Sequence, residues 1–366
     1  MTSRLQPVLI AIAAMLTMAW TPANAADKPL KVFIMAGQSN MQGHAKASTL
    51  PGLAMDPNTK PLYDKLVDAN GKPRVFKDVN IVYFSGAGKS SVEKPSKKAG
   101  PLTVGFGSDM GTEVAFGAIM QEHLKEPILI IKTAWGGKSL CLNFRPPSAG
   151  DFDWPAVTAG NLKKEGKYEG RLSGARKVQG IYYRLIVEHV NEVLANPAQY
   201  CPGYNPNQGY EIAGFVWLQG FNDIIDDWVY PRKNYSLYSE LLGHFIRDMR
   251  KDLKAPKMPF VIGVYGVGGN DPRSLSFRKA MAAPAEFPEF KGNVLAVPMA
   301  DYWDDKLSGL LARKDKKEAL TNEENDYIAK NKSNEGFHYL GSAKILSRIG
   351  QAFAEALVNN MNKDGK

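Results

Sequence analysis

Three short segments of this 366-residue chain hold residue types that together can perform acyl transfer. Residues 37–41 read Gly-Gln-Ser-Asn-Met and directly follow the apolar run 31–36. A strand end fixes the serine, and the free amides of the next turn face the place where an oxyanion would form. Residues 220–223 read Gly-Phe-Asn-Asp, and residues 335–338 read Glu-Gly-Phe-His. The three segments supply a nucleophile, an oxyanion donor and an acid–base pair.

Ser39 is the candidate nucleophile. Its context lacks the second glycine of a Gly-x-Ser-x-Gly elbow, because Met41 stands there, and this argues against an ordinary α/β-hydrolase. Taken alone, Ser39 better suits a helix N-cap, a frequent position for serine after a strand. Together with the other two segments, the sequence favours a nucleophile over a helix cap at Ser39.

His338 is the candidate general base, close to the end of the chain. Glu335 precedes it by three residues, so its carboxylate can meet the imidazole Nδ1–H and hold the other nitrogen towards Ser39. The alternative is a surface loop with a chance acid and histidine. Of the other histidines, His44 has no obvious acid partner, and the remaining three fall in predicted helices and are expected to be structural (His123, His189 and His244).

The oxyanion of a tetrahedral intermediate needs preorganised donors, and losing one typically costs about 3–4 kcal/mol of barrier. Three donors are available: the amide of Ser39, an amide in the Trp-Gly-Gly-Lys stretch 135–138, and a carboxamide from Gln219 or Asn222. Glycines after a strand let an amide point into a site. Either carboxamide residue could instead be a plain turn former.

Apolar runs followed by helical patterns predict the scaffold around these segments. The runs are β-branched or aromatic-rich and typical of buried parallel strands, with a shorter strand candidate at 81–84 (31–36, 127–133, 212–218, 259–265 and 293–298). Helical spacing recurs between and after them (113–123, 181–194, 235–253 and 345–359). This alternation predicts a doubly wound, three-layer α/β fold with a mostly parallel sheet and ligands at the carboxyl ends of its strands.

Three polar stretches interrupt this pattern (45–110, 141–178 and 299–334). They hold few of the apolar residues that an independent core requires, so we expect long surface loops on one domain covering 26–366. Residues 1–25 have the basic start, apolar stretch and Ala-Asn-Ala end of a secretory signal peptide, although an uncleaved anchor is the alternative. The expected location is therefore periplasmic or secreted, with no membrane span after cleavage.

The net charge of +9 comes from lysines that are scattered and interleaved with acids, which is typical of a solvated surface and not of a nucleic-acid stripe. Weak attraction to an acidic polysaccharide is compatible with it. Cys141 and Cys201 could pair in an oxidising compartment or remain buried thiols, and the sequence does not decide. Neither has a zinc-type spacing, and the sequence predicts no metal or cofactor.

The chain resembles SGNH-type hydrolases of the sialate O-acetylesterase and acetylxylan-esterase group, carbohydrate esterase family six. The resemblance rests on the Gly-Gln-Ser-Asn-Met start, the Gly-x-Asn-Asp block, the preceding Gln-Gly pair, the strand with Gly-Gly at 130–139 and the acid-x-x-His block. It runs in order from about residue 31 to 350, with unmatched loops between. It implies an SGNH, flavodoxin-like fold.

Carried over by residue, the resemblance implies that Ser39 is the nucleophile, His338 the base and Glu335 its orienting acid. Gly137, or else Gly136, would complete the oxyanion hole together with Asn222 or Gln219. The family usually has Asp three residues before the histidine, so the acid could instead be another one (Asp301, Asp304 or Asp305). Where the family often has Glu after Gln-Gly, this chain has Phe221.

The sequence therefore predicts an exported carbohydrate O-acetylesterase that acts through an acyl-serine. Its expected partner is an acetylated oligo- or polysaccharide of undetermined identity, and its oligomeric state is open. A catalytically idle carbohydrate-binding protein and a lipid or longer-acyl esterase are the alternatives. Aromatic residues near the motifs could stack on a sugar or belong to the core (Trp135, Phe221, Trp228 and Tyr339).

Overall fold

The computed structural model describes residues 28–85, 96–226 and 228–364. The predicted signal peptide lies outside these ranges. Within them, no helix is both long and apolar enough to cross a membrane.

A seven-stranded sheet in the order β3-β2-β4-β1-β5-β6-β7 forms the centre of the fold. All neighbouring pairs are parallel except β2 with β3, which is antiparallel. The strands are β1 (Leu30–Gly37), β2 (Val75–Ser85), β3 (Ser96–Thr103), β4 (Ile128–Ala134), β5 (Tyr210–Leu218), β6 (Phe260–Val264) and β7 (Val294–Pro298). The fold class predicted from the sequence, a doubly wound α/β sandwich, is confirmed.

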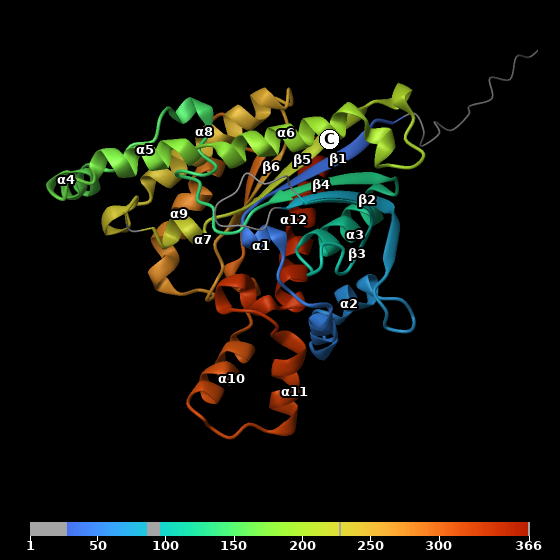
Figure 1. The fold of residues 1–366 in the computed structure, drawn as a ribbon. Helices are drawn as coiled ribbons and strands as arrows, with labels where there is room; N and C mark the ends of the chain where they lie inside the picture. Colours follow the sequence, from blue (N-terminus) through green and yellow to red (C-terminus); the bar gives the residue numbers. More distant parts are fainter. Residues whose placement is uncertain (1–27, 86–95, 227, 365–366) are drawn as a thin grey trace, which may run out of the picture.

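Helices cover both faces of the sheet, with α6 and α8 above it and α3 and α12 below it in Figure 1. Each face has its own apolar core, because strand residues that alternate in sequence point to opposite sides. The helices are α1 (Ser39–Gln42), α2 (Lys60–Leu66), α3 (Glu113–Leu124), α4 (Ala156–Lys164), α5 (Tyr168–Val178), α6 (Ile181–Ala195), α7 (Phe221–Ile224), α8 (Ser236–Asp252), α9 (Leu275–Ala282), α10 (Asp305–Asp315), α11 (Asn322–Asn331) and α12 (Ala343–Asp364).

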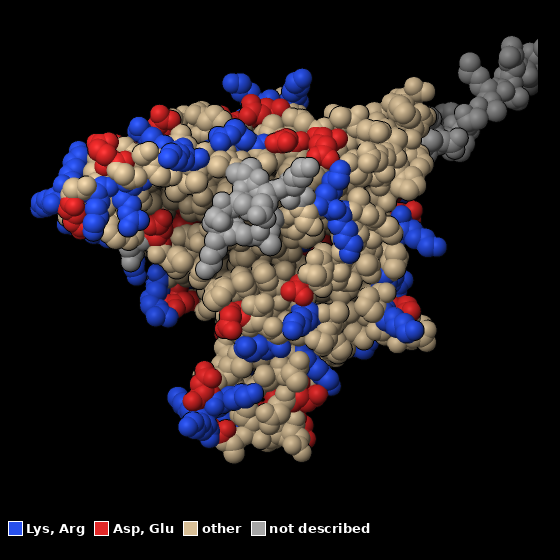
Figure 2. All heavy atoms as spheres, in the orientation of Figure 1, with Lys and Arg blue, Asp and Glu red and all other residues tan. Residues whose placement is uncertain are grey.

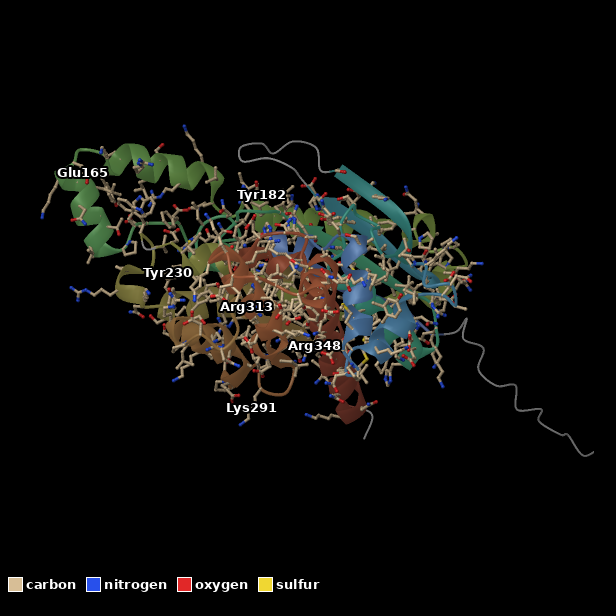
Figure 3. All side chains as sticks on the ribbon, turned by 90° about the horizontal axis from the view of Figure 1, so that it is seen from below. Glu165, Tyr182, Tyr230, Lys291, Arg313 and Arg348 are labelled. Carbon is tan, nitrogen blue, oxygen red and sulfur yellow. The ribbon has the colours of Figure 1, made fainter. Side chains whose placement is uncertain are left out.

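The expectation that the polar stretches are irregular was wrong. Residues 141–178 contain α4 and α5, and residues 299–334 contain α10 and α11. Both helix pairs extend away from the sheet as arms, to the left and at the bottom of Figure 1. Figure 3 shows Glu165 at the far end of the α4–α5 arm. The arms are polar in sequence because each of their helices buries only one or two apolar side chains.

Cys141 and Cys201 are both buried and unpaired. Cys201 accepts a 3.6 Å hydrogen bond from the side chain of Asn80, while the Cys141 thiol lies 3.3 Å from the hydroxyl of Ser139. Burial raises the pKa of both thiols. The question of pairing that the sequence left open resolves in favour of two separate thiols.

Candidate active site

Ser39 is the first residue of α1, directly beyond the carboxyl end of the central strand β1. Gly37 makes this turn possible, because a Cβ there would lie 2.1 Å from the carbonyl oxygen of Leu218 on β5. Gln38 occupies the N-cap position, and the Ser39 hydroxyl makes no hydrogen bond with any described residue. The hydroxyl is thus not used as a helix cap. It remains available for chemistry although the residue is only 9% exposed.

The side chain of Gln38 joins the serine turn to the segment after β5. Its carboxamide oxygen accepts a 2.9 Å hydrogen bond from the backbone amide of Gly220, so this atom must be the oxygen. Its nitrogen then donates to Oδ1 of Asn222 at 2.9 Å. This bond identifies the oxygen of the Asn222 carboxamide, so the other terminal atom is its nitrogen. The Nδ2 group of Asn222 donates to no described residue and is available as an oxyanion donor.

Gln219, the other carboxamide considered from the sequence, is used differently. It is 3% exposed, and its nitrogen donates to the Lys138 carbonyl at 3.0 Å and to Asp223 at 2.5 Å. Its oxygen accepts from the Tyr238 hydroxyl at 3.0 Å. These bonds occupy the carboxamide within the core, so in this structure Gln219 does not offer a donor to the site.

Asp223 is fully buried and ties two loops together. Its carboxylate accepts from the backbone amides of Leu140 and Cys141 at 2.8 and 3.1 Å and from the Tyr230 hydroxyl at 2.7 Å. Burial raises the pKa of Asp223, while these hydrogen bonds act in the opposite direction. The aspartate of the Gly-x-Asn-Asp block therefore holds the loop after β4 against the loop after β5.

That loop after β4 brings two glycines to the serine. A Cβ on Gly136 would lie 3.6 Å from the Cβ of Ser39, so the two residues are neighbours. Gly137 is exposed and has a left-handed backbone, with φ of 69°. The amides of both glycines donate no hydrogen bond to a described residue. Both remain candidates for the oxyanion hole, and Gly136 is the one seen in contact with Ser39.

The segment around His338 lies against α1. Nδ2 of Asn40 donates to the carbonyl of Phe337 at 3.1 Å, and the ring of His44 stacks on that of His338 with centroids 3.8 Å apart and an 8° interplanar angle. Folding therefore brings the two distant ends of the described chain together. The Ser39 hydroxyl and the imidazole are not hydrogen-bonded here, which is common before substrate binds.

The Nδ1 atom of His338 faces Asn334, at 3.0 Å from its Oδ1. The same Oδ1 accepts a 2.7 Å hydrogen bond from the backbone amide of Glu335, so it must be the oxygen of the carboxamide. An oxygen acceptor at this position requires His338 to carry its proton on Nδ1. The Nε2 atom then has a free lone pair, as a general base needs.

Glu335, predicted to orient His338, does not do so in this structure. The residue is exposed, and its carboxylate makes no hydrogen bond or ion pair with the described residues. Of the other acids considered, Asp301 accepts from Asn270, and Asp304 caps α10 and accepts from Tyr327. The side chain of Asp305, in the first turn of α10, makes no hydrogen bond or ion pair with a described residue. Asn334 takes the orienting position instead.

Strained backbone holds this loop in place. Tyr339 and Leu340 have φ values of 52° and 61°, a region that costs non-glycine residues about 1–3 kcal/mol each. The ring of Tyr339 is buried and its hydroxyl accepts from the amide of Gly266 at 3.2 Å. The carbonyl of Leu340 accepts from the amides of Ser333 and Asn334. The turn is thereby fixed on both sides, and it sets the position of the His338 ring.

Burial lowers the pKa of His338 to about 4, and the neighbouring His44 adds to the shift. Burial also lowers the pKa of His44. No carboxylate contributes to the shift at His338, in agreement with the position of Glu335. The base is therefore neutral, and able to accept a proton, over most of the acidic range.

A buried ion pair supports α1 from below. Lys132 on β4 donates to Glu113 at 2.7 Å and to the carbonyl of Gln42 at 2.8 Å, and lies 4.5 Å from the centre of the Tyr83 ring. Lys132 is 1% exposed. Sequence reasoning missed this group. The available signal was a lysine inside an otherwise apolar strand, since a buried cation requires a partner.

The aromatic residues near the motifs divide into two groups. Trp135 and Tyr339 are 4% and 1% exposed and belong to the core. Phe221 and Phe337 contact each other at 5.5 Å beside Asn222 and His338, and Trp228 is exposed. Among the described residues, no group of three or more histidines, cysteines or acids is placed to bind a metal ion.

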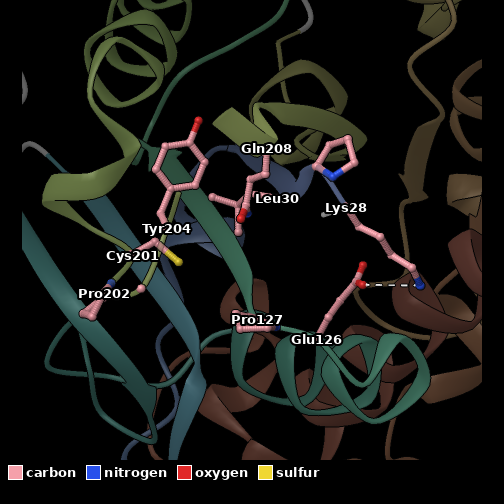
Figure 4. Close-up of a pocket in the computed structure, with 10 residues that line it drawn as sticks. Lys28, Leu30, Glu126, Pro127, Cys201, Pro202, Tyr204 and Gln208 are labelled. Carbon is pink, nitrogen blue, oxygen red and sulfur yellow. Dashed lines mark ion pairs between the residues drawn. The ribbon is translucent and has the colours of Figure 1, made fainter. Parts of the chain in front are cut away.

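A separate pocket lies at the opposite edge of the sheet. Figure 4 shows it around the start of β1, with a cavity volume of about 220 Å³ and an ion pair of 3.9 Å between Lys28 and Glu126. Its other labelled residues include Cys201 and Tyr204. Burial raises the pKa of the Cys201 thiol and keeps it protonated, so this pocket offers no activated nucleophile.

The fold brings a serine, a histidine and carboxamide groups together at the carboxyl edge of its sheet. The chain belongs to the family described as carbohydrate esterase, sialic acid-specific acetylesterase, whose model matches residues 29–292. The matched range includes Ser39, Gly136 and Asn222 and ends before His338. The protein is therefore a carbohydrate esterase by family.

Two solved structures are similar over much of their length. A protein from Arabidopsis thaliana is 15% identical with a TM-score of 0.46, over 91% of this chain and 99% of that one. A carbohydrate acetylesterase from Xanthomonas citri is 16% identical with a TM-score of 0.39, over 75% of this chain and 50% of that one. Among curated proteins, none matches the chain.

Proposed function

We propose that this protein is an exported serine esterase that removes O-acetyl groups from an acetylated oligo- or polysaccharide. The observation that carries the proposal is the convergence at one edge of the sheet of an uncommitted serine hydroxyl and a histidine whose tautomer leaves Nε2 free. Membership of the carbohydrate esterase family supports a sugar ester as the substrate.

In the first step the Ser39 oxygen attacks the acetyl carbonyl carbon while Nε2 of His338 takes the hydroxyl proton. The carbonyl oxygen becomes an oxyanion, and in this proposal Nδ2 of Asn222 and an amide of the Gly136–Gly137 turn donate hydrogen bonds to it. When the C–O bond to the sugar breaks, the imidazolium gives its proton to the departing alkoxide. The sugar leaves as an alcohol, and an acetyl-serine remains.

In the second step water attacks the acetyl-serine, and Nε2 of His338 accepts one of its protons. The tetrahedral intermediate collapses, the proton returns to Ser39 and acetate leaves. Asn334 keeps the Nδ1 proton in place through both steps, and His44 keeps the ring plane fixed. Asn334 stabilises the imidazolium less than a carboxylate would, because its oxygen carries only a partial charge.

The family description supports a short acyl group. The matching model is that of an acetylesterase, which favours acetyl as the group removed over the lipid or longer-acyl alternative. A narrow cavity of about 10 Å³ lies nearby between the ends of β1, β5 and β6, but neither Ser39 nor His338 lines it.

The test is acetate release from acetylated xylan and from 4-nitrophenyl acetate. The wild type should release acetate from both, Ser39→Ala should release none above background, and the exposed-serine control Ser276→Ala should match the wild type. Turnover of 4-nitrophenyl octanoate should be much lower than that of the acetate. Inactivity of the wild type with every ester would favour an idle carbohydrate-binding protein. Unchanged activity of Ser39→Ala would refute the mechanism.

Export rests on the sequence of residues 1–25. Expression of the full chain in a Gram-negative host should yield a periplasmic or secreted product whose N-terminal sequence begins at Ala26. A cytoplasmic product that retains residue 1 would contradict this part of the proposal.

A further inference from the structure

We propose that a groove lined by the α4–α5 arm binds an acidic sugar of the glycan chain, such as a uronic acid. This inference rests on the esterase function proposed above and assigns its substrate class. The groove has a volume of about 380 Å³, and its lining includes Trp154, Leu162 and Trp228. A space of this size accommodates a sugar ring, and the pocket is separate from Ser39.

The two tryptophans supply surfaces for stacking. Trp228 is 55% exposed, which is unusual for the largest apolar side chain in a protein that has ample core. Trp154 is half-buried, and its ring is held edge-on by Phe152 at 5.0 Å between centroids. Rigid aromatic faces beside polar groups are typical of sites that bind ligands with apolar faces and polar rims, as sugars have.

Two cations and two acids line the groove, and one of the cations has no acidic partner among the described residues. Lys167 is paired with Glu165 at 3.0 Å, while Arg171 forms no ion pair with a described residue. A guanidinium matches a carboxylate with two parallel hydrogen bonds. Asp226 also lines the groove, so the anionic group is expected at the Arg171 end and a neutral hydroxyl beside Asp226.

The electrostatic field around the groove is positive, like the charge of Arg171. Residues 156–178 carry six cationic and two acidic side chains, for a net charge of +4. Figure 2 shows these lysines and arginines gathered on the arm at the left of the molecule. A cationic arm raises the local concentration of an acidic polymer and increases its rate of association.

Hydrogen bonds connect the residues around the groove to the residues of the esterase site. The carbonyl of Trp228 accepts a 2.7 Å hydrogen bond from Thr158 on α4, which fixes one wall to the arm. The nearby Tyr230 hydroxyl bonds to Asp223, the residue that follows Asn222. Figure 3 places Tyr230 between the arm and the body of the molecule. A glycan held in the groove can thus present an acetylated neighbour towards the carboxyl edge of the sheet.

The experiment measures binding without turnover, by calorimetry on the full chain carrying Ser39→Ala. Trigalacturonate should bind more tightly than xylotriose, and Arg171→Ala should weaken trigalacturonate by about 5- to 10-fold, as expected for a lost charged hydrogen bond, with little effect on xylotriose. The matched control is Lys164→Ala, which removes the same charge from the arm outside the groove and should change affinity less than twofold. Trp228→Ala should weaken both ligands.

Equal affinity for the two trisaccharides, or equal losses in Arg171→Ala and Lys164→Ala, would overturn the inference. Activity of the wild type, Arg171→Ala and Trp228→Ala towards 4-nitrophenyl acetate is measured separately and should be unchanged. A wild type inactive towards every ester would end the proposed function but leave the binding result readable. If the wild type is an active esterase but shows no preference for trigalacturonate, the inference about the groove fails and the proposed function stands.

Discussion

Two histidines with the same lowered pKa sit in very different surroundings. Burial lowers the pKa of both His189 and His338 to about 4. His189 lies inside the core on α6, stacked on Phe84 at 4.1 Å, with Nδ1 2.9 Å from the hydroxyl of Thr133. His338 lies in a strained loop at the carboxyl edge of the sheet, half-buried beside α1.

The difference shows that a shifted pKa does not by itself identify a catalytic group. Desolvation produces the same shift in a packed core as in an active site. The two residues differ in access: His189 is 2% exposed, whereas His338 is half-buried, and its Nε2 makes no hydrogen bond with a described residue. The predictions below test whether this contrast is functional.

The largest effect is expected from His338→Ala. Without a base the serine is hardly nucleophilic, so kcat should fall by about 10⁴-fold or more. The melting temperature should stay close to that of the wild type, because the ring packs at the surface. Steady-state kinetics and calorimetry on the same preparation measure both. A variant that keeps most of its kcat would remove His338 from the mechanism.

The reverse pattern is expected for His189→Ala. Deleting this ring leaves a cavity and an unpaired Thr133 hydroxyl, so the free energy of unfolding should drop by roughly 2–4 kcal/mol. The kcat per folded molecule should not change. Urea unfolding and active-site titration test the two halves, and a loss of kcat at full folding would contradict the structural role.

The same residue makes stability depend on pH. The pKa of His189 is lower in the folded state, about 4, than the ordinary value of 6.5. Between these values the unfolded chain binds more protons, so stability is full above pH 6.5 and is lost as the pH falls towards 4. His189→Gln should flatten this part of the unfolding profile. An equally steep profile in that variant would exclude His189 as a source.

Asn334→Ala should reduce kcat by about 10- to 100-fold, because the Nδ1 proton loses its acceptor and the required tautomer is less populated. Glu335→Gln is the matched control and should stay within about twofold of the wild type, as its carboxylate contacts nothing described. If the glutamine variant fails and the alanine variant does not, the orienting residue is Glu335 after all.

Asn334→Asp tests the contact between residue 334 and His338 through the pH dependence of kcat/KM. A carboxylate at Nδ1 favours the protonated imidazole and raises the pKa of His338. Because the base must be neutral, the acidic limb of the kcat/KM profile should move to higher pH than the wild-type limb, which follows a pKa of about 4. An unmoved limb would show that Asn334 does not contact His338 in solution.

A smaller effect is expected at His44. Its ring stacks on His338 at 3.8 Å and can act as a positioning residue. His44→Ala should lower kcat about 5- to 10-fold with little change in KM, since a stacked pair contributes of order 1 kcal/mol. His44→Phe should recover most of the loss because it restores a flat ring. No recovery with Phe would point to a role for the ring nitrogens instead.

The sheet could be predicted from the sequence because its strands are buried on both faces and read as continuous apolar runs, such as 127–133 for β4. β3 could not, because Ser-Lys-Lys-Ala-Gly-Pro-Leu-Thr is a polar edge strand. The two helical arms were missed for a similar reason: α5 buries only Leu172 and Ala175, too few to mark an apolar face.

The site was predictable to the level of segments and less so to the level of side chains. Ser39 stands out by its type and its position after a strand, and His338 by its type and the acid three residues before it. The choice of Asn334 over Glu335 depends on the positive φ values of Tyr339 and Leu340, which reverse the loop and which no local pattern indicates. The choice of Asn222 over Gln219 depends on a long-range bond from Gln38.

Covalent labelling tests the central claim most directly. Diisopropyl fluorophosphate should inactivate the wild type and add one diisopropylphosphoryl group to the peptide that contains Ser39, as read by peptide mass spectrometry. Ser39→Ala should remain unlabelled, and His338→Ala should label far more slowly. A label on a different serine, or full esterase activity after Ser39 is modified, would contradict the account.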